Sequence, residues 1–199
     1  EPEPGLNGRV LAYPRGKVLG GCSSINGMIY MRGQARDYDH WRQLGNTGWG
    51  WDDILPYFKK SESYFGGADE FHGSDGELPV EEQRLSWPIL DAVQQAAQEI
   101  GIPPTQDFNT GDNEGAGYFE VNQKSGIRWN ARKAFIDPAK GRSNLQVVTD
   151  AHVEKLVFEG RRVTGLILRH GNTRKSVSVN QEVVMASGAI GTPQILQLS

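Results

Sequence analysis

The chain has 199 residues, enough for one ordinary domain or two small ones, and its 37% hydrophobic residues and 25 glycines give a globular composition. Acidic and basic residues are interspersed and sum to a formal net charge of −3, which excludes the basic surface of a nucleic-acid-binding protein. No apolar stretch reaches the ~18–20 residues of a membrane span, and the N-terminus carries no secretory signal, so we expect a cytoplasmic protein without a membrane span.

The predicted elements begin with a long ordered loop. Prolines and glycines exclude regular structure over residues 1–14, and the glycine- and serine-rich residues 15–32 are expected to form a loop that enters a helix. Helical spacing of apolar residues predicts short surface helices over 37–44 and 52–62. The small, polar residues 66–76 favour turns.

A better helix is predicted to open at Ser86, with Pro88 in its first turn, where proline is tolerated. The apolar residues that would share one face of this helix are Ile89, Val93, Ala96, Ala97 and Ile100. Turn residues dominate 106–126, and a short helical pattern over 129–136 is expected to end at Asp137-Pro138.

The C-terminal third changes to β-branched, strand-like runs, which predict a β-meander followed by a buried strand. These runs cover residues 145–149, 153–158, 162–169, 176–179 and 182–186. The last run leads into a glycine turn at Ser187–Gly191. A helix is expected to start after it, with Thr192 as N-cap and Pro193 at the first helical position.

One segment, Arg15–Gly27, has the composition of a ligand-binding loop. Paired glycines let the backbone approach a planar or phosphate-bearing ligand closely, and backbone N–H groups with small hydroxyl side chains can donate to anionic oxygens. A structural glycine turn before a helix explains the same residues. No Gly-Lys-Ser/Thr follows at the spacing of a P-loop.

The longer string "GKVLGGCSSINGMIYMRG" strongly resembles a signature of the glucose-methanol-choline oxidoreductases, especially their choline-dehydrogenase-like members. A second family signature is similar to residues 188–199, which end before its closing glycines. The segments "YDHWRQLGNTGWGWDDILPYFKKSE" and "GIRWNARKAFI" also resemble family segments in family order. The resemblance covers nearly the whole chain.

This resemblance implies an α/β fold, α+β overall, made of part of a Rossmann-like FAD-binding domain and part of an antiparallel-sheet substrate domain. Residues 1–36 would supply the flavin-binding loop and helix start, residues 37–140 a portion of the substrate domain, and residues 141–199 a portion of the FAD-binding domain. The implied activity is oxidation of an alcohol at its CH–OH group, with hydride transfer to flavin N5. The sequence does not identify the alcohol or the electron acceptor.

The resemblance also places individual residues beside the cofactor. Cys22, Asn26 and Gly27 would lie beside the flavin or the FAD phosphates, and Val153 would hold the adenine through its main chain. Near the end of the chain, Ser187, Gly188 and Ala189 would lie close to the dinucleotide. Taken alone, Val153 reads as a core strand residue, the Ser187 segment as a glycine turn, and Cys22, the only cysteine, as a small packing residue.

Some relatives attach FAD covalently through a histidine directly before the asparagine of the first signature. Ile25 occupies that position here and cannot form the bond, so we expect non-covalent FAD.

No catalytic residue and no metal site are predicted within the chain. The four histidines, His40, His72, His152 and His170, share no spacing and are expected at the surface. The family's "GxGxxG" loop and its C-terminal histidine base are absent from the sequence, which starts at Glu1 without a methionine. We therefore expect an internal fragment that is inactive alone. A non-enzymatic module that binds a nucleotide or another protein is the alternative.

Overall fold

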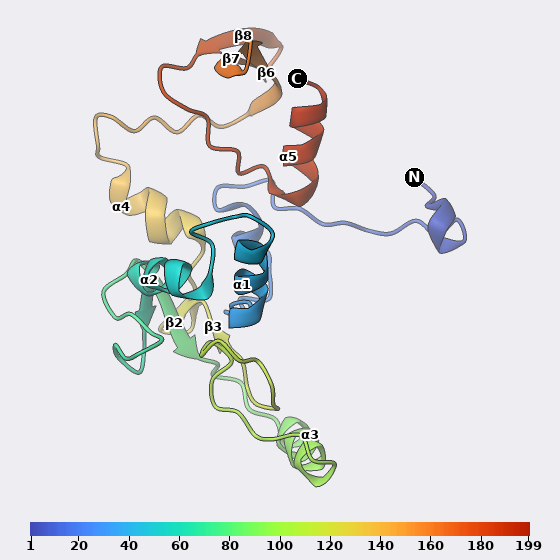
Figure 1. The fold of residues 1–199 in the computed structure, drawn as a ribbon, viewed down its shortest axis with the longest axis vertical. Helices are drawn as coiled ribbons and strands as arrows, with labels where there is room; N and C mark the ends of the chain where they lie inside the picture. The colour runs from blue at the N-terminus through green and yellow to red at the C-terminus, as the bar shows by residue number, and fades with distance from the viewer. The chain divides into compact units, whose positions relative to one another are not determined.

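The computed structural model describes all 199 residues, and the chain divides into two compact units, Glu1–Arg142 and Ser143–Ser199 (Figure 1). None of the helices combines the length and the hydrophobicity needed to cross a bilayer. The helical elements of the first unit are η1 (Pro4–Leu6), η2 (Gly21–Ser24), α1 (Ala35–Gln43), α2 (Trp51–Ser61), α3 (Pro88–Glu99), η3 (Arg132–Ile136) and α4 (Asp137–Ala139). Its strands are β1 (Glu62–Tyr64), β2 (Leu78–Glu82), β3 (Glu120–Val121), β4 (Gln123–Lys124) and β5 (Ile127–Arg128). The second unit contains β6 (Ala151–Glu159), β7 (Arg162–His170), β8 (Thr173–Ser178) and α5 (Gly188–Gln197).

Helices α1 and α2 confirm two predictions, with ends shifted by one or two residues. Each has an aspartate in its first turn, Asp37 or Asp53, whose carboxylate accepts the N–H of the N-cap residue at 2.9 and 3.1 Å. Tyr38 on α1 joins the helices, because its ring centroid lies 5.4–5.9 Å from three other aromatic rings, those of Trp41, Trp51 and Phe58.

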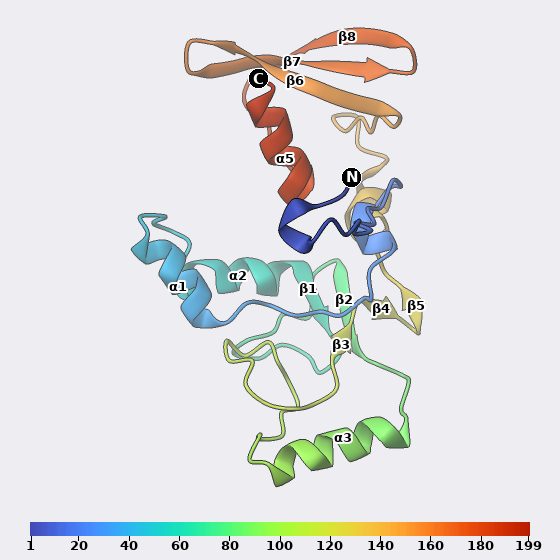
Figure 2. The ribbon, with the colours of Figure 1, turned by 90° about the vertical axis from the view of Figure 1, so that its right-hand side faces the viewer.

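A small three-stranded sheet follows α2, and the sequence pattern did not reveal it. Strand β1 pairs in parallel with β2, and β2 pairs antiparallel with β3 (Figure 2). Val80 at the middle of β2 is 0% exposed. Strands of two to five residues are too short to show an alternating pattern, and they are held mainly by contacts distant in sequence.

Helix α3 confirms a predicted helix, but the helix begins at Pro88, and Trp87, not Ser86, is its N-cap. Its apolar face is open to solvent, since Ile89, Val93 and Ile100 are 62%, 58% and 78% exposed. The amphipathic pattern therefore correctly indicated the helix, while nothing in its own unit covers that face.

The helix near residue 130 runs further than predicted. Residues Arg132–Ile136 form a π-helical turn, η3, in which the Asp137 N–H donates to the Arg132 carbonyl, and the chain continues as α4. Asp137-Pro138 does not end the helix, and Pro138 lies within the continuous helical run formed by η3 and α4.

The second unit contains the predicted meander. Strands β6, β7 and β8 pair antiparallel in chain order, and Leu156 on β6 is 4% exposed. The predicted strands over 145–149 and 182–186 are wrong, since neither segment pairs with a neighbour and Val184 is 82% exposed. A β-branched run becomes a strand only where a neighbour can take its backbone hydrogen bonds.

The predicted start of the last helix is also wrong. Helix α5 begins at Gly188 with Ser187 as N-cap, and Pro193 lies inside it instead of at its first position. The Thr192 hydroxyl oxygen accepts the Ser187 N–H at 3.2 Å, so threonine satisfies a donor at the helix start from within the helix.

Val80→Ala tests the small sheet. Removing two methyl groups from a fully buried site is expected to lower the free energy of unfolding by about 2 kcal/mol, from lost burial plus a cavity. Urea denaturation measures the change. Val10→Ala, at a site 67% exposed in the same unit, is the control and should change stability by less than ~0.5 kcal/mol. Equal effects of both substitutions would contradict the described core.

Candidate cofactor-binding site

The segment Arg15–Gly27, here called the flavin loop, folds back closely on itself. A Cβ on Gly16 would stand 2.2 Å from the carbonyl oxygen of Gly21, so only glycine fits there. Gly20 and Gly21 have φ angles of 93° and 54°, in the left-handed region. Cys22 lies inside the fold of the loop, where its Sγ accepts the Gly16 N–H at 3.5 Å. The glycines therefore create a compact turn around Cys22.

Residues 128–131, here called the latch, hold the flavin loop from more than a hundred positions away. Arg128 Nη1 donates to the Ser23 carbonyl at 3.1 Å and to Asn26 Oδ1 at 2.8 Å. Asn130 Nδ2 donates to Ser24 Oγ at 2.9 Å, and the Ala131 N–H donates to Ser23 Oγ at 2.9 Å. These hydrogen bonds join the segment "GIRWNARKAFI" to the flavin loop in the folded chain.

The hydroxyls of Ser23 and Ser24, which by composition could donate to a ligand, donate to carbonyl groups of the loop itself. Ser23 Oγ donates to the Gly20 carbonyl and Ser24 Oγ donates to the Leu19 carbonyl. Because a hydroxyl has a single proton, neither serine has a donor left for a ligand in this arrangement.

The exposed end of the loop offers free donors instead. Asn26 and Gly27 are exposed, and neither the Asn26 Nδ2 group nor the Gly27 N–H has a hydrogen-bond partner in the chain. A Cβ on Gly27 would meet no heavy atom within 4 Å, so a ligand can approach the backbone there. Of the predicted site residues, these two have the geometry of ligand contacts, while Cys22 serves the shape of the loop.

In the second unit, a cavity of about 490 Å³ brings two predicted site residues together, Val153 on β6 and Ser187 before α5. Val153 precedes a β-bulge, where the pairing register with β7 shifts. Gly188 and Ala189 begin α5 and do not line the cavity. The other lining residues are Ala151, His152, Glu154, Arg169, Gly191, Gln194, Ile195 and Leu198. This size suits part of a nucleotide.

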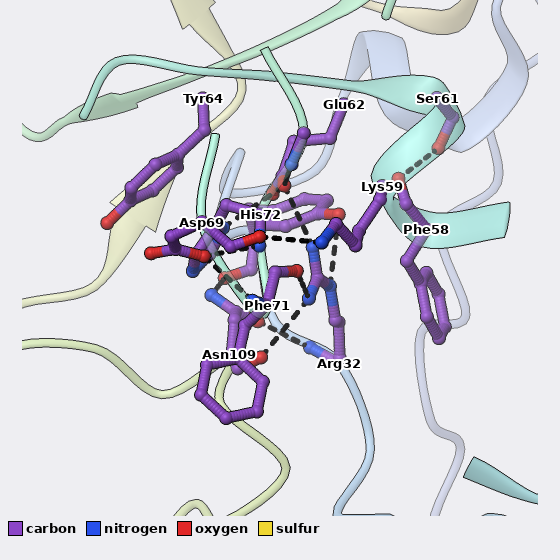
Figure 3. Close-up of polar contacts among 12 residues, drawn as sticks. Arg32, Phe58, Lys59, Ser61, Glu62, Tyr64, Asp69, Phe71, His72 and Asn109 are labelled. Carbon is purple, nitrogen blue, oxygen red and sulfur yellow. Dashed lines mark hydrogen bonds and ion pairs between the residues drawn. The ribbon is translucent and has the colours of Figure 1, made fainter. Parts of the chain in front are cut away.

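A buried polar network lies beyond the loop in the first unit, and sequence reasoning missed it (Figure 3). Glu62 Oε2 accepts hydrogen bonds from Arg32 Nη2 at 2.9 Å, from His72 Nδ1 at 3.1 Å and from the Gly73 N–H at 3.0 Å. His72 Nε2 contacts Asp107 Oδ2 at 2.9 Å. Arg32, Glu62 and His72 are all at most 4% exposed.

The prediction that all four histidines lie at the surface is wrong for His72. His40, His152 and His170 are exposed, but His72 is 1% exposed. Its charged neighbours come from positions 10 and 35 residues away, so no local pattern indicates the site. The turn-prone composition of residues 66–76 predicts the conformation of the backbone. It does not determine whether a side chain such as His72 is buried.

The network shifts the pKa of two of its members, His72 and Asp107. Burial lowers the pKa of His72, but hydrogen bonds to Asp107 and Glu62 outweigh it and raise the pKa to about 9. Burial raises the pKa of Asp107, while hydrogen bonds from His72 and from the Asn109 N–H bring it below its usual value. At neutral pH a protonated His72 thus lies between the side chains of Glu62 and Asp107, and Arg32 pairs with Glu62 at 2.9 Å.

The same network makes stability pH-dependent. Because the pKa of folded His72, about 9, lies above its ordinary 6.5, its contribution is complete below pH 6.5 and is lost as pH rises through 9. We expect the free energy of unfolding to fall across this interval and to fall less steeply in His72→Gln. Denaturation at stepped pH measures both slopes, with His40→Gln as the exposed control. Identical slopes in wild type and His72→Gln would contradict the buried imidazolium.

Comparison with known sequences identifies relatives along the whole chain. The sequence model described as GMC oxidoreductase matches residues 4–199. The oxygen-dependent choline dehydrogenases of Brucella anthropi and Sinorhizobium fredii are each 42% identical over 199 residues, which is all of this chain and 36% of theirs. The chain thus spans about a third of the length of these curated relatives.

Solved structures agree. An FAD-dependent oxidoreductase from Chaetomium thermophilum matches with a TM-score of 0.92 and 33% identity, over 100% of this chain and 37% of that one. Pyridoxine 4-oxidase from Mesorbium loti matches with a TM-score of 0.80 and 30% identity, over 89% of this chain and 36% of that one. These likenesses confirm the predicted mixed fold, and with the match over residues 4–199 they establish that the chain belongs to the GMC oxidoreductase family.

Proposed function

We propose that the protein is an FAD-dependent oxidoreductase that acts on the CH–OH group of an alcohol, in the manner of a choline dehydrogenase. The observation that carries this proposal is the signature loop, folded with Asn26 and Gly27 as free donors at its exposed end. Relatives named as choline dehydrogenases and a structural relative named as FAD-dependent support the same conclusion. FAD, when bound, supplies the hydride acceptor, its N5 atom.

The residues of the flavin loop fit a flavin or a pyrophosphate. Asn26 and Gly27 would donate hydrogen bonds, and the missing side chain of Gly27 leaves the backbone open to a planar group. Cys22 would contribute through the loop shape that it maintains with Gly16. The latch would hold the loop while the cofactor binds.

The second unit supplies a site for the rest of the dinucleotide in this proposal. Val153 and Ser187 line the 490 Å³ cavity, and Gly188 and Ala189 place the N-terminus of α5 beside Ser187. The adenine would be held at Val153 and the remaining dinucleotide near the helix start, where free N–H groups favour anions. Residues 1–36 and 141–199 would then be the cofactor portions, and residues 37–140 the substrate-side portion.

The proposal assigns no catalytic base to this chain. Both ring nitrogens of His72 are engaged by carboxylates, so the imidazole has no free position from which to take a substrate proton. The remaining histidines are exposed and share no site. The base that takes the alcohol proton is therefore expected from residues outside these 199, and the 199 residues alone are expected to be inactive.

The experiment that tests this function uses the protein expressed from its complete gene. We expect flavin absorption bands in the purified protein, and anaerobic addition of choline or another primary alcohol should bleach them. Flavin that no alcohol reduces would contradict alcohol oxidation. A protein without flavin would favour a non-enzymatic binding module.

The attachment of FAD gives a separate prediction. Ile25 occupies the position before Asn26, and a hydrocarbon side chain cannot bond to the isoalloxazine ring, so acid precipitation should release all the flavin into the supernatant. Absorbance of pellet and supernatant measures the partition. Ile25→His supplies an imidazole at this position and is the matched comparison. Flavin retained in the wild-type pellet would contradict non-covalent attachment.

A further inference from the structure

The orientation of the Asn26 side-chain amide is determined by the chain itself. One end of the amide lies 3.1 Å from the Met28 backbone nitrogen and 2.8 Å from Arg128 Nη1. Both neighbours are donors only, and the two ends of an asparagine amide differ, since Oδ1 accepts and Nδ2 donates. The shared end must therefore be Oδ1. The NH₂ group then faces away from both and has no partner in the chain.

Arg128 is itself held in place beside Asn26. The same Nη1 group donates to the Ser23 carbonyl at 3.1 Å, and the Arg128 carbonyl accepts Lys133 Nζ at 2.8 Å, so both ends of the residue are held. Arg128 forms no ion pair with a carboxylate. Arg132, four residues later, differs: it pairs with Asp137 and its side chain is 50% exposed.

The Met28 contact alone leaves the amide less constrained. The hydrogen bond from the Met28 N–H to Asn26 Oδ1 is a local turn between residues two positions apart. Arg128 comes from a different segment, 102 residues away, so its hydrogen bond fixes Asn26 relative to the rest of the unit. Pre-orienting a donor in this way lowers the entropy lost on binding.

From this geometry we propose that Arg128 is a positioning residue: it holds Asn26 Oδ1 so that the free Nδ2 group is presented as a hydrogen-bond donor to FAD. This inference rests on the proposed function for its ligand. It assigns the latch a role in cofactor affinity beyond folding. Arg128 touches Asn26 and Ser23, and it acts on the cofactor only through the loop.

A double-mutant cycle tests the proposal in the protein expressed from its complete gene. FAD is removed, and fluorescence titration gives the dissociation constant for FAD in wild type, Arg128→Ala, Asn26→Ala and the double variant. Each single substitution should raise the dissociation constant about tenfold, the typical effect of one lost hydrogen bond. The double variant should also be about tenfold weaker than wild type, because without the amide Arg128 has nothing to orient.

Two further variants separate positioning from folding. Arg128→Lys keeps a donor within reach of Asn26 Oδ1 and should recover part of the affinity. Arg132→Ala, the matched control, should leave the dissociation constant within about twofold of wild type, as expected for an exposed ion pair. Thermal unfolding of each apoprotein shows whether the variants are folded.

The outcomes distinguish this inference from the function on which it rests. Suppose that wild type binds FAD and that Arg128→Ala raises the dissociation constant by the same factor with and without Asn26. That result would overturn the proposed route through Asn26. Unchanged affinity in Arg128→Ala would also overturn it. Failure of wild type to bind FAD would overturn the proposed function together with this inference.

Discussion

The first unit depends on one buried carboxylate. A single oxygen of Glu62 accepts hydrogen bonds from a guanidinium, an imidazole and a backbone N–H, and the residue is 0% exposed. Burying a carboxylate is costly unless cations and donors surround it. Here the donors come from Arg32, His72 and Gly73, so the carboxylate joins segments that share very little regular secondary structure. The strands around it have two to five residues, and their ladders alone would hold these segments weakly.

The network around Glu62 is connected to the flavin loop through the residues that follow the loop in the chain. The Tyr30 N–H donates to the Glu120 carbonyl at 2.9 Å, and the Asn122 N–H donates to the Met28 carbonyl at 2.8 Å, which attaches the chain to β3. Arg32 then enters the buried network. The loop is thus fixed after its last residue by the sheet and the network, and along its length by the latch. At the exposed end of the loop, the Asn26 Nδ2 group and the Gly27 N–H have no hydrogen-bond partner in the chain.

Whether an element could be predicted from the sequence depends on how far apart along the chain its interacting residues lie. Helices α1, α2 and α3 and the meander were predicted because periodicity and turn residues are local, and the loop was found through its signature. His72 and the small sheet were missed because their partners are far along the chain. The runs at 145–149 and 182–186 show the opposite error: a strand-like composition without a neighbouring strand is insufficient. Local propensity describes what a segment can form, and pairing decides whether it does.

Ser23, Ser24 and Asn26 of the flavin loop differ in which of their atoms remain free for a ligand. All three have polar side chains that composition alone marks as possible ligand contacts. In the folded chain the hydroxyls of Ser23 and Ser24 donate to loop carbonyls, whereas Arg128 and Met28 occupy only the acceptor end of Asn26. A hydroxyl that donates its only proton within the protein has no donor left for a ligand. An asparagine amide whose oxygen accepts hydrogen bonds keeps its NH₂ group as a donor. The serine contacts lie within the loop, but Arg128, which holds the Asn26 oxygen, comes from 102 residues away, so the loop sequence alone does not predict how Asn26 is oriented.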